Sequence, residues 1–177
     1  QQVGCALGWV IAIEELHSSV VYCITDLLGR TTRVEIPRGV RQGSVEGPLL
    51  FILVLALALT ELRAEVRLFQ SDLQVTWQGQ VFSLLALSYA DDTTFFALPY
   101  DVASLRQFLD CIQHTMRRFG LSLNWAKTKY LLVLRGRGSK KRAAGHPPSG
   151  GFLRLDLAGG AIELQRVAQF KLLGSQV

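Results

Sequence analysis

The sequence is poor in cysteine and in long apolar runs. Its three cysteines, Cys5, Cys23 and Cys111, form no pair with zinc-ligand spacing, and their odd number argues against a disulfide framework. A reducing compartment is therefore expected. The longest apolar run, residues 49–59, falls short of the roughly 18 residues that a membrane-spanning helix needs, so it predicts a buried core helix instead.

The amino-terminal stretch also lacks the basic start and the cleavage pattern of a secretory signal. We therefore expect an intracellular protein, in the nucleus or the cytoplasm, with no membrane partner. The first residue is Gln1 rather than a methionine, which predicts that the chain is a piece of a longer polyprotein.

Charge and hydropathy indicate a folded, basic chain. Hydrophobic residues make up 49% of the 177 residues and charged residues 19%, a globular composition that allows one sizeable core. The net charge of +5 favours acidic partners such as nucleic acid, although many basic proteins bind nothing anionic.

Periodicity predicts helices interleaved with mostly antiparallel strands, which is the α+β class. Helical spacing covers residues 8–28, a strand follows at 30–37, and Pro48 opens a second helix that is buried through Leu59. Strands are expected over residues 72–98, with turns at Gly79 and at the sequence YADD.

The second half of the chain continues the alternation of helix and strand. An amphipathic helix is expected between a cap at Asp101 and a stop at Gly120. A strand at residues 129–134 and a hairpin over 152–167, turning at Gly159 and Gly160, complete the pattern.

Two adjacent carboxylates, Asp91 and Asp92, stand between two apolar, β-branched runs in FSLLALSYADDTTFFAL, residues 82–98. A regular strand would point them to opposite faces, whereas a tight turn between Tyr89 and Thr93 places both at the tip of a hairpin. Neighbouring anions repel, and Mg²⁺, which prefers a few carboxylate oxygens with waters and phosphates, removes that repulsion. Aspartate is also common in solvated turns, so the doublet alone does not establish a metal site.

The order of four motifs along the chain suggests a function for the aspartate doublet. RGVRQGSVEGPLLF, residues 38–51, precedes YADD, while GLSLNWAKTK, residues 120–129, and FKLLG, residues 170–174, follow it. In this order the motifs resemble the palm of a reverse transcriptase of the non-LTR (LINE-type) retrotransposon group. The resemblance implies a polymerase palm, an antiparallel sheet packed against helices, with a truncated fingers portion.

The resemblance also implies the chemistry, which is RNA-directed DNA polymerisation. The partners would be a dNTP and a primed RNA or DNA template, and the cofactor would be Mg²⁺, with Mn²⁺ as the alternative. In this reaction the primer 3′ hydroxyl attacks the α-phosphate, while two metal ions activate the attacking oxygen and stabilise the leaving pyrophosphate.

The resemblance also implies roles for individual residues. Asp91 and Asp92 would be the catalytic metal ligands, and the Lys127 ammonium would stabilise or protonate departing pyrophosphate. A loop glycine in the nucleotide-binding motif also lets the backbone approach a base pair closely. The residues expected to contact nucleotide or template are Arg41, Gln42, Gly43 and Tyr89. An ordinary turn before a helix, an exposed lysine and a strand aromatic are the plainer explanations of these positions.

Residues 136–150 read as a flexible basic loop rich in glycine and proline. Its lysines and arginines suit a nucleic-acid backbone, although a charged loop of this kind is more often only solvated.

One part of the family pattern is missing. The family uses three metal-binding carboxylates, and the first ends an apolar strand upstream of the RQG motif. Residues 1–37 offer only Glu14, Glu15, Asp26 and Glu35, none of which ends such a strand. Residues 1–177 are therefore expected to be a partial reverse transcriptase domain without its first-aspartate segment, inactive by itself.

Two other hypotheses stay open. One is a non-catalytic nucleic-acid-binding remnant of a retroelement polymerase, which would hold a primer and template without chemistry. The other is a membrane-associated or protein-interaction domain built on the apolar helix at residues 49–59, which leaves the ordered motifs unexplained.

Overall fold

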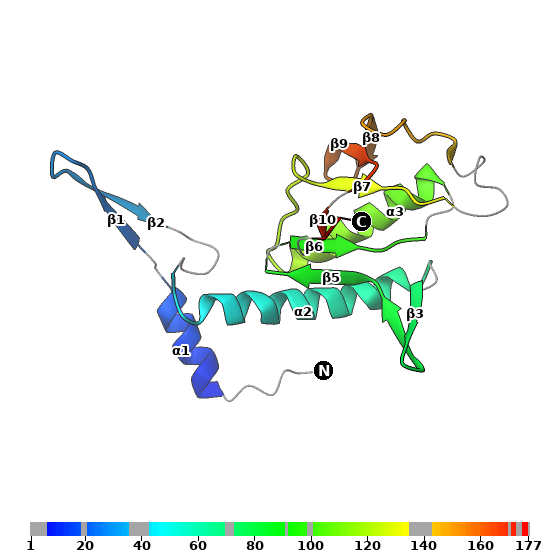
Figure 1. Ribbon diagram of the computed structural model, residues 1–177. Helices are drawn as coiled ribbons and strands as arrows, with labels where there is room; N and C mark the ends of the chain where they lie inside the picture. Colours follow the sequence, from blue (N-terminus) through cyan, green and yellow to red (C-terminus); the bar gives the residue numbers. More distant parts are fainter. Residues whose placement is uncertain are drawn as a thin grey trace. The chain divides into compact units, whose positions relative to one another are not determined.

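The structure is a computed structural model that describes residues 7–18, 21–35, 43–69, 73–90, 92–98, 101–134, 143–169, 171–172 and 175–176. The chain divides into two compact units, residues 1–53 and 54–177. Helices alternate with small sheets that are mostly antiparallel, so the described elements have the mixed α+β character predicted from the sequence (Figure 1).

The first unit contains helix α1 (Leu7–His17) and a hairpin of β1 (Val21–Thr25) and β2 (Thr31–Glu35). One helix over residues 8–28 was the expectation, and it is wrong, because α1 ends at His17 and Val21–Thr25 forms a strand. The sequence VYCIT is rich in the β-branched and aromatic residues that favour strands. The strand expected at residues 30–37 is confirmed by β2.

Turn chemistry explains why the hairpin replaces the longer helix. The Asp26 carboxylate accepts hydrogen bonds from the backbone N–H groups of Leu28 and Arg30, each at 2.9 Å, and pairs with the Arg30 guanidinium at 2.8 Å. These bonds, led by those from Arg30, lower the pKa of the Asp26 carboxyl. An aspartate that bonds its own following backbone favours a turn over a continuing helix.

Helix α2 (Gly47–Val66) contains the division between the two units. Pro48 lies in its first turn, as predicted, and the Ser44 hydroxyl caps the helix by accepting a hydrogen bond from the Gly47 N–H at 3.0 Å. Within the described ranges, no helix combines the length and the apolar content needed to cross a bilayer.

The burial of α2 differs from the prediction of a helix buried through Leu59. Leu49 is 69% exposed and Ile52 is 58% exposed, so the first half is open. The second half buries one stripe at helical spacing, so it is amphipathic. The buried members of the stripe are Leu55, Ala58, Leu62 and Val66.

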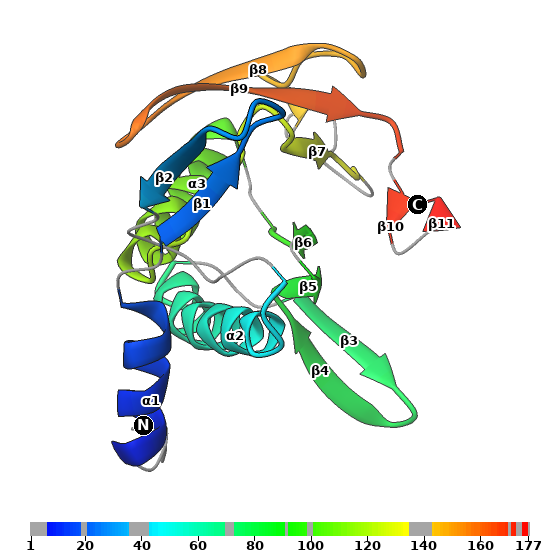
Figure 2. The ribbon, with the colours of Figure 1, turned by 90° about the vertical axis from the view of Figure 1, so that its left-hand side faces the viewer.

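Helix α3 (Val102–Arg118) lies between the second half of α2 and the strands β8 and β9 (Figures 1 and 2). The Asp101 carboxylate caps it by accepting a hydrogen bond from the Ser104 N–H at 2.8 Å, and Gly120 follows its end with a φ of 73°. Both predicted ends are therefore confirmed. Its apolar core face comprises Leu105, Phe108, Leu109, Ile112 and Met116.

A carboxylate on α2 joins the two helices. Glu65 accepts hydrogen bonds from the Thr115 hydroxyl at 2.8 Å and from the Arg118 guanidinium at 3.0 Å, and Glu61 pairs with the same guanidinium. Thr115 is fully buried, so its hydroxyl would lose its partner without Glu65. Burial, followed by the nearby Glu65 carboxylate, raises the pKa of the Cys111 thiol to about 11.

Two hairpins follow α2 in the second unit. Strands β3 (Leu73–Trp77) and β4 (Gln80–Leu84) pair around the predicted turn, where Gln78 and Gly79 have φ values of 48° and 75°. Strands β5 (Ala86–Tyr89) and β6 (Asp92–Phe95) form the next hairpin. An Arg63 hydrogen bond to the Ser83 carbonyl, at 3.3 Å, links β4 to α2.

The carboxyl-terminal part contains a three-stranded sheet of order β7–β9–β8. It comprises β7 (Lys129–Leu131), β8 (Phe152–Leu157) and β9 (Gly160–Val167), and two short strands, β10 (Lys171–Leu172) and β11 (Ser175–Gln176), follow. The predicted hairpin over residues 152–167 is confirmed.

The turn between β8 and β9 lies against α3. The Asp110 carboxylate accepts a hydrogen bond from the Ala158 N–H at 2.8 Å, and a Cβ added to Gly159 would meet the Gln113 and Arg117 side chains. Glycine at this position therefore allows the close approach of the hairpin to the helix.

The segment before β8 is fastened to β9. Arg166 exchanges backbone hydrogen bonds with Gly150 and Gly151, and its guanidinium donates to the Pro147 carbonyl at 2.6 Å. The Tyr130 hydroxyl lies 3.4 Å from Nδ1 of His146. Burial, and after it the charge of Arg166, lowers the pKa of His146. Of the basic loop expected over residues 136–150, residues 136–142 lie outside the described residues.

The contact between α2 and α3 generates a stability prediction. We expect Glu65→Gln to lower the free energy of unfolding by about 1 kcal/mol, because the Thr115 hydrogen bond loses its charged acceptor and the Arg118 ion pair becomes a hydrogen bond to a neutral amide. The same change should lower the pKa of the Cys111 thiol. Urea denaturation measures the first effect, and Glu163→Gln, at an exposed position of β9, is the control. Equal losses in both variants would contradict the prediction.

The environment of His146 generates a pH prediction. Its folded pKa lies below the ordinary 6.5, so between the two values the unfolded chain binds more protons and the folded state weakens as the pH falls. The free energy of unfolding should therefore drop between pH 7.5 and pH 5.5, in urea titrations at about these values, by more in the wild type than in His146→Gln. His114→Gln, on the exposed side of α3, should keep the wild-type pH dependence. Identical curves for His146→Gln and the wild type would refute this role of His146.

Candidate functional site

Strands β5 and β6 carry the aspartate doublet at their connection. Tyr89 pairs with Asp92, so only Ala90 and Asp91 separate the strands, and the hairpin predicted at YADD is confirmed. Ala90 has a φ of 51°, in the left-handed region that costs a residue other than glycine about 1 kcal/mol. Asp91, the first residue of the predicted metal site, lies outside the described residues.

The two faces of this hairpin have different surroundings. The Phe95 ring meets Phe108 of α3 edge to face, with ring centroids 6.5 Å apart. Because side chains alternate along a strand, Asp92 points to the other face, together with its cross-strand partner Tyr89, which is 70% exposed. The hairpin therefore presents Asp92 and Tyr89 on the face that does not pack on α3.

The Asp92 carboxylate is exposed and makes no hydrogen bond or ion pair with any other described residue. Carboxylate oxygens of this kind are the ligands that Mg²⁺ takes together with waters and substrate phosphates. In the described part of the chain, no three His, Cys, Asp or Glu side chains converge on one point. Among the described residues, Asp92 therefore offers one carboxylate that fits a divalent cation.

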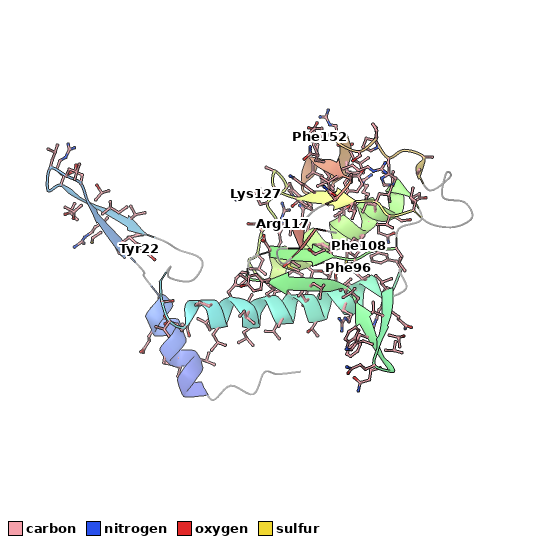
Figure 3. The ribbon with its side chains drawn as sticks, viewed as in Figure 1. Tyr22, Phe96, Phe108, Arg117, Lys127 and Phe152 are labelled. Carbon is pink, nitrogen blue, oxygen red and sulfur yellow. The ribbon has the colours of Figure 1, made fainter. Side chains whose placement is uncertain are left out.

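Lys127 lies on the segment between α3 and β7 (Figure 3) and is exposed. Asn124 holds the backbone there, because its side-chain oxygen and its carbonyl accept hydrogen bonds from the Lys127 N–H at 3.2 Å and 3.1 Å. The Thr128 hydroxyl donates to the same carbonyl at 2.7 Å. Sequence reasoning missed Asn124, although an asparagine in an aperiodic stretch is a signal of such a turn.

The remaining predicted residues lie in the first unit or outside the described ranges. Arg41 and Gln42 are outside them, and Gly43 belongs to the first unit, whereas Tyr89, Asp92 and Lys127 belong to the second. Gly43 has a φ of 84°, and a Cβ added to it would meet no atom of the described residues within 4 Å. In this structure its backbone conformation, rather than a crowded neighbour, accounts for the glycine.

The acidic residues upstream of these motifs do not lie where the family pattern places its first aspartate, at the end of an apolar strand. Glu14 and Glu15 lie on α1, Glu35 ends the exposed strand β2, and the Asp26 carboxylate is occupied by the β1–β2 turn and by Arg30. None of them ends a buried strand of the described part of the chain.

Comparison with known proteins places the chain among the polymerases that copy nucleic acid. Residues 11–177 match the family described as reverse transcriptase (RNA-dependent DNA polymerase). The chain belongs to this family, which acts on a nucleic-acid template with deoxynucleotides and generally uses divalent metal ions. Neither the curated proteins nor the solved structures give a match.

Proposed function

We propose that this chain is the palm region of a non-LTR (LINE-type) reverse transcriptase, with a metal-binding site at Asp91 and Asp92. The observation that supports it most is the β5–β6 hairpin, which carries beside Tyr89 an exposed Asp92 carboxylate with no partner among the described residues. Mg²⁺ is the expected cation and Mn²⁺ the alternative, because both accept carboxylate and phosphate oxygens.

A divalent cation bound there would offset the negative charge of the phosphates of an incoming dNTP. The chain itself contributes binding and orientation. Asp91 and Asp92 supply oxygen ligands, and the Tyr89 ring, on the same face as Asp92, gives a flat surface for the primer end. Lys127, whose backbone is fixed by Asn124, supplies a positive charge for the pyrophosphate.

Nucleotide and template contacts belong to the loop before α2 in this proposal. Its residues are Arg41, Gln42 and Gly43, assigned by the motif order and by membership of the family. The Ser44 hydroxyl caps α2 directly after these residues.

We also propose that residues 1–177 are a partial domain with two of the three catalytic carboxylates. The upstream acids occupy a helix, a turn and an exposed strand, where the family pattern requires an aspartate at the end of an apolar strand. A site short of one anionic ligand binds two cations poorly. By this proposal the chain alone is inactive or very weak, and the polymerase is the longer parent polyprotein.

A second candidate is a nucleic-acid-binding remnant without catalysis. The observation in its favour is that the described part of the chain contains no convergent group of three ligating side chains. It differs from the first proposal in the parent protein, where it predicts binding of a primer and template without synthesis.

The metal site can be tested by Tb³⁺ luminescence excited through tyrosine. Asp92→Asn and Asp91→Asn should each weaken Tb³⁺ binding by about tenfold, because each removes one anionic ligand. Asp156→Asn, at an exposed position of β8, is the matched control and should leave the affinity unchanged. Unchanged affinity in Asp92→Asn would rule out the proposed metal site.

The partial-domain proposal predicts the result of primer extension on a homopolymer RNA template with Mg²⁺. The chain alone should give no synthesis above background, because the third carboxylate is missing. The parent protein should extend the primer and lose that activity in Asp91→Asn. Robust Asp91-dependent synthesis by residues 1–177 would show that the domain is complete, and a parent protein that binds but never extends would favour the remnant.

A further inference from the structure

We infer that the hydroxyl pair of Ser88 and Thr93 positions Asp92 for cation binding. This inference rests on the proposed metal site and adds two residues that touch neither the cation nor the substrate. Both act through the hairpin, so they are positioning residues.

The Ser88–Thr93 pair is next to the Tyr89–Asp92 pair in the hairpin and is one pair farther from the turn. Ser88 and Thr93 are directly opposite in the β5–β6 register, and their side-chain oxygens are 3.1 Å apart. Because side chains alternate, these hydroxyls lie on the face opposite to Asp92, on the side of Phe95. In the described part of the chain, this is the one side-chain hydrogen bond that joins β5 to β6.

The hairpin needs such a bond because Ala90 does not favour the turn. Two-residue connections usually carry glycine or asparagine where φ is positive, whereas Ala90 has a Cβ and a φ of 51°. Each strand has only four residues, so few backbone pairs oppose a change of register. A slip by one residue would carry Asp92 to the opposite face, toward α3.

The base of the hairpin is held separately. The Phe96 N–H donates to the Leu85 carbonyl at 2.8 Å, and the Phe95 ring rests on Phe108 of α3. These contacts fix the base of the hairpin to the core. The Ser88–Thr93 bond therefore supplies the constraint between the fixed base and the aspartate.

A Tb³⁺ titration of hydroxyl variants tests this role. Thr93→Val should raise the dissociation constant about fivefold, and Thr93→Ser, which keeps the hydroxyl, should stay within about twofold of the wild type. Thr94→Val is the matched control, because Thr94 is the next residue, lies on the other face and pairs with Leu87. It should also stay within about twofold.

A double-mutant cycle separates positioning from general strand weakening. Ser88→Ala should have the same effect as Thr93→Val, and the double variant should be no worse than either, since all three lack one hydrogen bond. Far-UV circular dichroism of each variant checks that it is folded. Additive losses, or equal losses in Thr94→Val and Thr93→Val, would overturn the inference.

The failure of the inference is distinguishable from the failure of the metal site. If Asp92→Asn weakens Tb³⁺ binding and Thr93→Val does not, the inference is wrong and the metal site stands. If Asp92→Asn leaves the binding unchanged, the metal site is wrong and the inference falls with it.

Discussion

The packing of α3 is the constraint on which the second unit depends. On one side the Glu65 carboxylate of α2 satisfies the buried Thr115 hydroxyl, and on another the Phe108 ring supports β6. The Asp110 carboxylate holds the turn between β8 and β9. A two-stranded hairpin is marginal by itself in water, so β5–β6 owes its fixed geometry to this helix.

The β5–β6 hairpin has one face that packs on α3 and one face that carries exposed polar side chains. Phe95 faces the core, while Tyr89 and Asp92 face away from it, and the alternation of side chains along the strand makes the separation obligatory. The Asp92 carboxylate, which has no partner among the described residues, is tolerated on this face because it is exposed to water.

Sequence patterns predicted the helices and strands correctly where the stabilising interactions join residues close in sequence. The Asp101 cap, the amphipathic face of α3 and the YADD hairpin all depend on residues close in sequence. The spacing of apolar residues wrongly predicted a helix at Val21–Thr25. The hydrogen bonds of the Asp26 turn and the β propensity of these residues favour a strand there instead. The Glu65–Thr115 contact joins positions 50 residues apart, and no pattern in one sequence marks such a pair. The motif order predicted the site, which stays a prediction, and the Ser88–Thr93 hydrogen bond beside it could be found only in the structure.

The most direct test of the account is Mn²⁺-induced broadening of backbone amide signals in an NMR titration of this chain. A cation bound at the aspartate doublet should broaden the signals of residues 89–94 first, and Asp92→Asn should abolish that pattern, because paramagnetic relaxation falls steeply with distance from the ion. Broadening that starts in another part of the chain, or that persists unchanged in Asp92→Asn, would contradict the account.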